Sequence, residues 1–567
     1  MVFNPTSLFY TDGYKIGHRK MLAPGTTKLY GTWIPRTIKY APAGVTKIVS
    51  FGQQLVVQWL HDEFTQNFFA LPKDEVIKFG KDMSLYLGIE YDASHFEDLY
   101  DLGYLPIRIK SLPEGIETDP NIPHMTFINT VDGFAWLTLY LETIISSLAW
   151  KPATSATLAL QYKRNVVEWV MKTDPASVSL IPFLAHDFSA RGLSPWDMLS
   201  SGLGHATSFR GSDSIIVIPG ARHYYHEPET ETCINSVNAS EHSVSTTCIF
   251  TMGESDMLKY FMDQYPTGIL SLVSDTFNLW DFITEYLPAN KDQIMARDGK
   301  VVVRPDSGDP CDILCGYATR KNTSIRKDGL GIFYADTDDS DKPISDWTKI
   351  TDAEYTGVIE ALWNIFGGTI NAQGFKVLDS HIGAIYGDSI TLARQLEIYS
   401  RLALKGFAST NIVLGIGSYT YQFNTRDTFG FAAKGSWFEV GELAEPTQDN
   451  SKLITTSYSI YKDPITDDGT KKSLKGLCSV HTHIDHDGVI LGYFTRQECT
   501  QDEETKGILQ TIYENGKFYN EISLTQIREN LDQLVNYSLP PEGSQNSSKI
   551  DQILNNYINQ SFNSSSY

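Results

Sequence analysis

Arg304 and Asp306 bring a cation and a carboxylate to one corner of the chain, directly after the apolar run "VVV". Charges that follow a buried strand are costly unless they are paired or bind a ligand. One interpretation is therefore a structural ion pair between the two side chains. The other is a binding corner, because Ser307 and Gly308 leave the backbone open to close approach by a ligand.

Two further corners carry glycine after apolar runs, in "YGDSI" (386–390) and "LGIGSY" (414–419). Each could present backbone N–H groups at the start of a following helix, which is an arrangement that binds phosphate. Either corner alone fits an ordinary tight turn. Together with Arg304 and with Arg191 of "ARG" (190–192), they predict a phosphate pocket.

His242 lies in "NASEHSVS" (238–245), between turn residues and a possible helix. A lone histidine usually packs or faces solvent. Asp275, which ends the apolar run "SLVSD", could orient the imidazole if both residues reach the same edge of a sheet. That arrangement would give His242 a catalytic or phosphoryl-accepting role.

Asp213 stands in "SFRGSDSIIVIPG" (208–220), between a Gly-Ser turn and β-branched residues. An aspartate before an apolar segment is a common helix N-cap, and that is the simplest interpretation. The run "IIVI" resembles a strand locally. The alternative is that the Asp213 carboxylate contacts a substrate.

Two stretches resemble metal sites. "HTHIDHD" (481–487) groups His481, His483 and His486, but the sequence that follows favours an exposed hairpin turn. "ADTDDSDKPISD" (335–346) lacks the glycine and the glutamate that a calcium-binding loop needs at its sixth and twelfth positions, so a solvated surface loop is expected. We predict no metal held by protein ligands.

The elements that must position these corners change character along the chain. Residues 1–178 mix short strands and helices and predict an α+β domain, to which 428–540 contribute. Over 179–427, short apolar runs end in polar corners and alternate with helical segments, which indicates buried parallel strands in an α/β barrel. The corners would then converge at the carboxyl ends of the strands. Residues 541–567, rich in Ser and Asn, predict a mobile tail.

The charge balance and the cysteine content limit the class of protein. The chain of 567 residues has 46 basic and 68 acidic residues, a net charge of −22, which disfavours binding to nucleic acid or acidic lipid. Six cysteines are too few for a disulfide scaffold and fit a cytoplasmic protein. No secretory signal is apparent, and the most apolar segment, 134–150, is short for a membrane span and contains Glu142.

Taken in order, the corners resemble the nicotinamide phosphoribosyltransferases, which are type II phosphoribosyltransferases, over nearly the whole chain. The matching stretches are "TDGYK" (11–15), "LPIRIKSLPEG" (105–115), "WLTLYLETI" (136–144), "HDFSARG" (186–192), "FRGSD" (209–213), "SEHS" (240–243), "VSD" (273–275), "RPDSG" (304–308), "YGDS" (386–389), "TRD" (425–427) and "YKDP" (461–464).

The resemblance implies an incomplete α/β barrel, an α+β domain built from both ends of the chain, and a homodimer with shared active sites. The implied reaction joins nicotinamide to 5-phosphoribosyl 1-diphosphate and gives nicotinamide mononucleotide and diphosphate, in NAD salvage. Mg²⁺ would arrive with the diphosphate. ATP would phosphorylate His242 beside Asp275, coupling its hydrolysis to the transfer.

The resemblance also implies a role for each matching residue. Nicotinamide would be bound by Phe188 and Tyr14 on its two faces, Tyr14 coming from the partner subunit, and by Asp213, Arg191 and Asp12. The phosphoribosyl group would be bound by Arg304, Asp306, Gly387, Asp388, Gly417 and Ser418. The diphosphate would be bound by Arg36, Arg426, Lys434 and Lys462.

Three features depart from the family pattern. Ser418 and Tyr419 stand where glycines are expected, Leu184 replaces a usual lysine at a tunnel mouth, and the insert at 311–350 is longer than expected.

Other functions stay open on the sequence. A nicotinate phosphoribosyltransferase shares the barrel, and the ring pocket separates the two, because an aspartate at 213 would accept a hydrogen bond from an amide and repel a carboxylate. A catalytically silent binding protein of the same fold would not require Arg304, Asp306 and His242 together. A barrel hydrolase would not need so many phosphate-binding cations.

Overall fold

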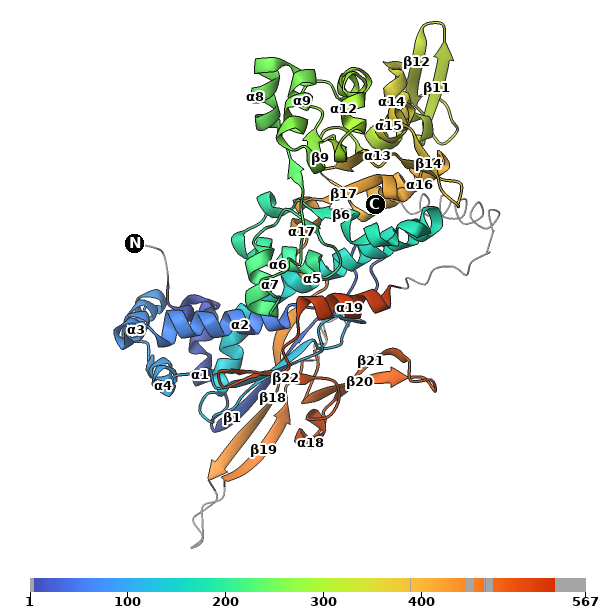
Figure 1. Ribbon diagram of the computed structural model, residues 1–567. Coiled ribbons are helices and arrows are strands. Elements are labelled where there is room, and N and C mark those ends of the chain that lie inside the picture. The colour runs from blue at the N-terminus through green and yellow to red at the C-terminus, as the bar shows by residue number, and fades with distance from the viewer. Residues whose placement is uncertain (1–4, 388, 444–452, 463–464, 466–472, 536–567) are drawn as a thin grey trace. The chain divides into compact units, whose positions relative to one another are not determined.

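The computed structural model describes residues 5–387, 389–443, 453–462, 465 and 473–535, which form two compact units (Figure 1). Unit 1 comprises residues 1–158, 219–231 and 424–531, and unit 2 comprises 159–218, 232–423 and 532–567. Residues 159–178, expected in the first domain, cluster with unit 2, and 219–231, expected in the barrel, cluster with unit 1. The tail expected at 541–567 lies outside the described residues.

Unit 2 is built on a seven-stranded sheet in the order β7-β6-β17-β16-β10-β9-β8, in which every neighbouring pair is parallel. The strands are β6 Ala185–Asp187, β7 Gly211–Ser212, β8 Asn238–Ala239, β9 Thr267–Val273, β10 Asp298–Arg304, β16 Ile382–Tyr386 and β17 Ile412–Ile416. Most of their apolar residues are buried, as expected for strands covered on both faces, although Ile269 near the start of β9 is exposed.

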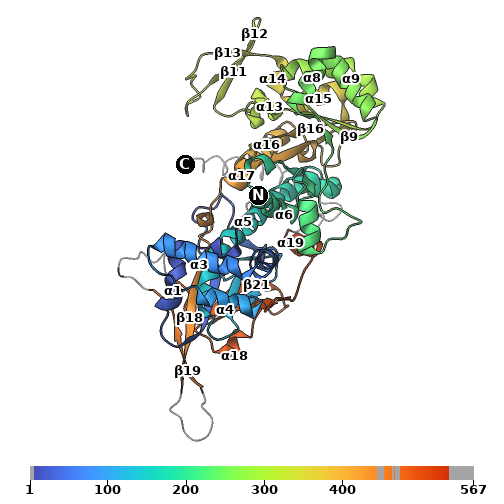
Figure 2. The ribbon, with the colours of Figure 1, turned by 90° about the vertical axis from the view of Figure 1, so that its left-hand side faces the viewer.

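The sheet curls without closing through a regular strand pair. The two edge regions meet at one isolated parallel bridge, between Gly211 of β7 and Asn235, which precedes β8. The predicted incomplete barrel is thus confirmed. Its helices are α6 Pro195–Ala206, α8 His242–Met252, α9 Glu254–Gln264, α10 Leu279–Asp281, α11 Leu287–Ala289, α12 Lys291–Met295, α13 Pro310–Cys315, α14 Asp352–Thr356, α15 Val358–Phe366, α16 Leu392–Leu404 and α17 Ser418–Gln422. Helices α8 and α9 lie side by side in both views (Figure 2).

Unit 1 contains a second seven-stranded sheet, in the order β19-β18-β1-β5-β3-β22-β23. Its first-half strands are β1 Thr26–Ile34, β3 Ile107–Ser111 and β5 Met125–Asn129, and its second-half strands are β18 Ala432–Leu443, β19 Leu453–Ser459, β22 Gln510–Glu514 and β23 Lys517–Phe518. Because β1 pairs with both β5 and β18, the two ends of the chain interleave. This confirms an α+β part made from both terminal segments.

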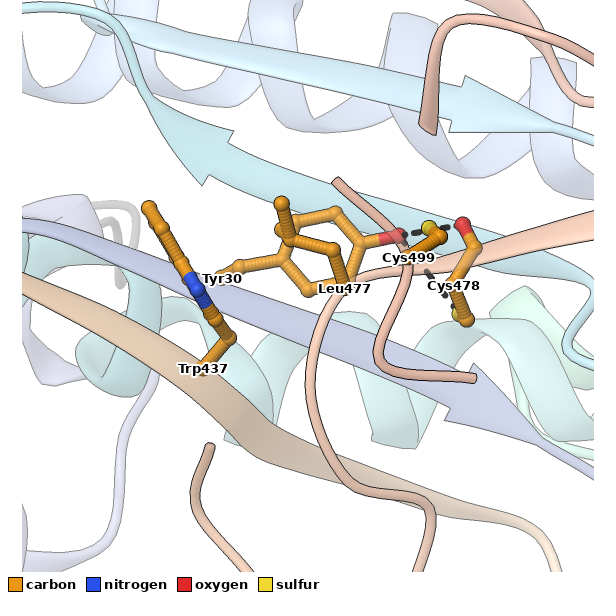
Figure 3. Packing of buried hydrophobic residues seen from close by; sticks show 5 residues of the cluster. All are labelled: Tyr30, Trp437, Leu477, Cys478 and Cys499. Carbon is orange, nitrogen blue, oxygen red and sulfur yellow. Dashed lines mark hydrogen bonds between the residues drawn. The ribbon is translucent and has the colours of Figure 1, made fainter. Parts of the chain in front are cut away.

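A small core cluster joins the two ends of the chain within unit 1 (Figure 3). Tyr30 of β1 packs with Trp437 of β18, Leu477, Cys478 and Cys499, and donates a hydrogen bond from its hydroxyl to the Cys478 carbonyl at 3.2 Å. The buried hydroxyl therefore keeps a partner, as buried polar groups require.

The helices of unit 1 are α1 His18–Met21, α2 Gln53–Phe64, α3 Lys73–Leu87, α4 Ser94–Leu102 and α18 Gln501–Glu504, while α5 Ala135–Thr173, α7 Val217–Tyr225 and α19 Leu524–Leu534 each contribute residues to both units. Among the helices that the structure describes, none combines the length and apolar character needed to cross a bilayer. Strands β20 Cys478–Ile484 and β21 Ile490–Gln497 form an antiparallel hairpin, which confirms the hairpin interpretation of "HTHIDHD".

The insert at 311–350 is only partly a loop. It includes most of α13 and then a three-stranded antiparallel sheet made of β11 Thr323–Asp328, β12 Gly331–Asp336 and β13 Thr348–Ile350. Residues 338–347, between β12 and β13, are exposed, as expected for a solvated segment.

A buried histidine in unit 1 makes stability depend on pH. His124 is fully buried, hydrogen-bonds the Thr118 hydroxyl at 2.8 Å, and has its pKa lowered by burial from 6.5 to about 3. Between those values only the unfolded chain binds the proton, so stability falls as pH falls below 6.5. We expect a loss of about 2 kcal/mol from pH 7 to pH 5 from this group. Calorimetry should show a shallower pH slope for His124→Gln than for the parent; equal slopes would contradict this account.

Candidate active site

The candidate residues of unit 2 follow the carboxyl ends of its parallel strands. Those that follow a strand directly or within a few residues are Phe188 after β6, Asp213 after β7, His242 after β8, Asp275 after β9, Asp306 after β10, Gly387 after β16 and Gly417 after β17. Since the carboxyl ends of parallel strands share one edge of a sheet, these groups meet on one face, as the sequence predicted.

The corner after β6 places an aromatic ring next to glycine backbone. Phe188 donates its backbone N–H to the Ile416 carbonyl at 2.9 Å, and its ring lies where a Cβ on Gly415 would come within 2.7 Å of it. A side chain at 415 would therefore displace the ring. His186, two residues earlier, packs against Phe188 with ring centroids 4.6 Å apart.

Asp213 is held by two hydrogen-bond donors. His186 Nε2 lies 2.9 Å from Asp213 Oδ1, and the Ser236 hydroxyl donates to the same oxygen at 2.5 Å. Burial alone would raise the pKa of Asp213, but the hydrogen bonds and positive charge contributed by His186, Ser236 and Arg304 hold this pKa below its ordinary value. The carboxylate is thus kept ionised while 44% of its side chain stays exposed.

The N-cap interpretation of Asp213 is wrong, and "IIVI" does not form the strand that it resembles locally. Ile215 and Ile216 form a turn, and α7 begins only at Val217. None of the described backbone N–H groups donates to the Asp213 carboxylate, because His186 and Ser236 already engage it. The capping interpretation therefore fails.

Asp187 joins the Phe188 and Asp213 corners. One carboxylate oxygen accepts the backbone N–H and hydroxyl of Ser189 at 2.9 and 2.6 Å, and the other accepts the hydroxyls of Ser212 and Ser214 at 3.2 and 2.6 Å. The Asp187 carbonyl also accepts the Asp213 N–H at 3.0 Å. A fully buried charge is tolerated here because four donors satisfy it.

Arg304 and Asp306 have separate partners, and no Arg304–Asp306 ion pair occurs among the described residues. The Arg304 guanidinium donates to the Ser240 carbonyl at 2.9 Å, while its buried Nε has no hydrogen-bond partner in the described part of the chain. A Cβ added to Gly387 would lie only 2.7 Å from Asp306 Oδ1, so a side chain at 387 would clash with this carboxylate. The corner is thus open and holds an incompletely satisfied cation, which favours the binding interpretation. Asp388 lies outside the described residues.

The corners at 387 and 417 differ from each other. Gly417 directly precedes α17, whereas α16 begins at Leu392 with Thr391 as its cap, so Gly387 does not open a helix. The side chain of Ser418 fills the space beside Gly192, next to Arg191. Arg191 keeps 91% of its side chain exposed and pairs with Glu241 at 3.1 Å. Leu184 is 3% exposed and packs in the core of unit 2.

His242 begins α8 and faces two carboxylates. Its Nε2 lies 3.6 Å from Asp275 Oδ1 and 3.8 Å from Asp306 Oδ2, and its Nδ1 lies 3.3 Å from the Thr276 hydroxyl. Asp275 Oδ2 accepts the N–H groups of Asp306 and Ser307 at 2.9 and 2.8 Å, leaving Oδ1 buried and unpaired among the described groups. Asp275 therefore fixes the β10 corner and still has an oxygen directed at the imidazole.

Unit 1 contains a cavity of about 650 Å³ whose charged lining groups are all cations. They are Arg36, Lys39, Lys434, Lys462 and Lys475. Burial and repulsion from Lys462, Arg36 and Arg426 lower the pKa of Lys434, although Glu142 acts in the opposite direction. Lys39 and Lys475 were not among the predicted residues, and Arg426 lies near this group without lining the cavity.

Tyr14 and Asp12 also belong to unit 1. Tyr14 is 67% exposed, and Asp12 accepts a hydrogen bond from the Thr143 hydroxyl at 2.6 Å. Burial raises the pKa of Tyr14, as do Asp12 and Glu142, and Arg426 lowers it. The predicted residues thus fall into a unit 2 set at the strand ends and a unit 1 set around the cations.

Removing Lys434 should weaken anion binding without destabilising the protein. In Lys434→Met we expect the dissociation constant for inorganic diphosphate to rise about tenfold, since one charge-assisted contact is lost. The melting temperature without ligand should rise, because the remaining cations repel one another less. Calorimetry with and without diphosphate tests both effects, with Lys506→Met, an exposed lysine paired with Asp502, as the control. Unchanged diphosphate affinity would contradict the assignment.

Comparisons with known proteins agree with this geometry. A family model described as the nicotinate phosphoribosyltransferase (NAPRTase) family matches residues 183–517. Proteins named nicotinamide phosphoribosyltransferase from Acinetobacter baylyi and from Xanthomonas campestris pv. campestris are 40% and 28% identical, over 94% and 93% of this chain and 98% of each relative. The crystal structure of human nicotinic acid phosphoribosyltransferase superposes with a TM-score of 0.50 at 14% identity, covering 96% of this chain and 99% of that one.

The half-barrel of parallel strands has the fold of the type II phosphoribosyltransferases. The chain belongs to the nicotinate phosphoribosyltransferase (NAPRTase) family.

Proposed function

We propose that the protein is a nicotinamide phosphoribosyltransferase, which joins nicotinamide to 5-phosphoribosyl 1-diphosphate and releases nicotinamide mononucleotide and diphosphate in NAD salvage. The observation that carries the proposal is the Asp213 carboxylate, held ionised beside Phe188 by His186 and Ser236. It would accept a hydrogen bond from a carboxamide and repel a carboxylate. The relatives named nicotinamide phosphoribosyltransferase support the same substrate.

The reaction needs positioning and charge stabilisation more than a general base. The pyridine nitrogen of nicotinamide is unprotonated at neutral pH and attacks C1 of the ribose as the bond from C1 to the diphosphate oxygen breaks. Arg304 would hold the 5-phosphate, and Asp306 the ribose. The cations of unit 1, Lys434 among them, would neutralise the departing diphosphate.

The proposal includes a homodimer in which Tyr14 and the cation cavity are supplied by the partner subunit. Its support is that Tyr14 is 67% exposed, so its ring is accessible to a second subunit. The cytoplasm is the proposed compartment, because the chain has few cysteines and the six, which all lie in the described residues, form no disulfide.

Mg²⁺ would enter as the counter-ion of the diphosphate and would neutralise part of its charge. No group of three or more histidine, cysteine, aspartate or glutamate side chains suited to a metal occurs in the described ranges. Phosphate oxygens and water would be its ligands, as is usual for Mg²⁺ bound with a substrate phosphate. ATP would be a co-substrate that phosphorylates His242, with Asp275 accepting a hydrogen bond from the imidazole.

One competition experiment tests the proposal. The purified protein receives phosphoribosyl diphosphate, Mg²⁺ and equal concentrations of nicotinamide and nicotinate, and the mononucleotides are separated by chromatography. We expect nicotinamide mononucleotide to dominate by at least about 100-fold, which corresponds to about 3 kcal/mol. Equal or greater use of nicotinate would overturn the amide assignment, and no product from either base would favour a silent protein of the same fold.

A further inference from the structure

We propose that His186 is a positioning residue that selects which oxygen of Asp213 is available to the substrate amide. The proposal rests on nicotinamide being the substrate. His186 does not need to touch the pyridine ring for this role. It acts by holding the carboxylate that does.

The His186 ring is fixed on three sides within unit 2. It belongs to β6, is 8% exposed, and packs against Phe188 at a centroid distance of 4.6 Å. A Cβ on Gly211 would lie 2.9 Å from His186 Nδ1. Because glycine has no Cβ, the imidazole can occupy this position. His186 therefore contacts both unit 2 groups proposed to bind the nicotinamide ring, Phe188 by packing and Asp213 by a hydrogen bond.

The two oxygens of Asp213 are used unequally. Oδ1 receives both described donors, His186 Nε2 at 2.9 Å and the Ser236 hydroxyl at 2.5 Å. Oδ2 receives no hydrogen bond from the described residues. A carboxylate offers about two acceptor positions on each oxygen, so the two donors saturate Oδ1 and leave Oδ2 free.

This asymmetry sets the proton on His186. An ionised carboxylate only accepts, so Nε2 must carry the hydrogen that points to Oδ1. Loss of that donor would let the carboxylate rotate about its Cβ–Cγ bond and would divide the amide contact between two orientations. It would also remove one of the groups that keep Asp213 ionised. Both effects weaken nicotinamide binding and reduce the repulsion of nicotinate.

Two variants separate this role from packing. In His186→Gln the side-chain amide nitrogen reaches about as far as Nε2 and can still donate to Asp213. In His186→Asn the amide is one methylene shorter and cannot reach. Both residues are polar and neutral, and both lose the aromatic contact with Phe188, so the pair differs chiefly in the hydrogen bond under test.

Steady-state kinetics of the two variants test the proposal. For His186→Asn we expect the KM for nicotinamide to rise about tenfold and the preference over nicotinate to fall about tenfold, as for loss of one charge-assisted hydrogen bond. The KM for phosphoribosyl diphosphate and kcat should stay within about threefold. His186→Gln should keep the nicotinamide KM and the preference within about threefold of the parent.

Other outcomes would overturn the positioning role. They are equal losses in the two variants, an unchanged preference in His186→Asn, or a fall in kcat with no change in KM. If His186→Asn does not fold, Ser236→Ala, which removes the other donor to Oδ1, must lower the preference for nicotinamide, and an unchanged preference there would overturn the proposal. A parent protein that fails to use nicotinamide would refute the proposed function, a result visible before any variant is made.

Discussion

Asp213→Asn should invert the preference of the protein between nicotinamide and nicotinate. His186 and Ser236 both donate toward one oxygen of residue 213, so the asparagine must turn its carbonyl toward them. Its NH₂ group then takes the free position and meets the NH₂ of nicotinamide, donor against donor. The same NH₂ would donate to the carboxylate of nicotinate. We expect kcat/KM for nicotinamide to fall about 100-fold, or about 3 kcal/mol, and that for nicotinate to rise.

The measurement is kcat/KM for both bases at saturating phosphoribosyl diphosphate. Asp263→Asn is a matched control, because Asp263 is exposed and lies near the carboxyl end of α9, which leads to the amino end of β9. The control should keep the parental ratio. If the ratio of kcat/KM for the two bases is unchanged in Asp213→Asn, the Asp213 carboxylate does not distinguish the amide from the acid.

His242→Ala should abolish any stimulation by ATP while basal transfer continues. The imidazole is 46% exposed and faces Asp275 and Asp306, so it can accept a phosphoryl group without being enclosed. The ring-binding and cationic groups lie on other corners and remain in place. We expect the ATP-dependent gain to vanish and the basal rate to stay within about threefold.

Initial rates with and without ATP test this expectation, and mass spectrometry of the protein after brief incubation with ATP should show one added phosphoryl group in the parent only. His223→Ala serves as the control, because His223 is also exposed and also faces a carboxylate, that of Asp62. It should behave like the parent. A His242→Ala protein that still responds to ATP would disprove the coupling.

The barrel corners could be predicted from sequence because the signal is local. Three valines followed by "RPDSG" mark both a buried strand and the polar groups at its end. The structure places Arg304 and Asp306 at the carboxyl end of β10. The interleaved sheet of unit 1 was also predictable in outline, since strand-like segments at both chain ends leave edges that must pair.

Partners distant in sequence could not be predicted in the same way. His186 and Asp213 are 27 residues apart, and Asp275 holds the backbone N–H of Ser307 from 32 residues away. The residues around each partner do not predict these hydrogen bonds, because each bond depends on how neighbouring strands align. Lys39 and Lys475 were missed for a related reason, as a single lysine is usually solvated and only the fold gathers five cations around one cavity.

The start of α7 shows the limit of a local pattern more directly. β-Branched residues in "IIVI" favour a strand, but Ile215 and Ile216 form a turn, and Val217 and Ile218 begin α7. Asp213 is hydrogen-bonded to the His186 side chain, and Ser214 to the Asp187 side chain. Because these bonds fix residues 213 and 214, the chain turns before the helix begins. The tertiary contacts of the corner decide this conformation.

The Asp187 carboxylate fixes the distance between the Phe188 corner and the Asp213 corner. Ser189 adjoins the phenyl ring, Ser212 and Ser214 flank the aspartate, and all three donate to the same buried charge. Moving the two corners apart would remove hydrogen-bond donors from the buried Asp187 carboxylate. The two corners must therefore move together or not at all. If these corners bind the base as proposed, we expect them to exclude a bulkier heterocycle by size alone. Tolerance for larger bases should then be gained by changing these serines, which are not among the residues proposed to bind nicotinamide.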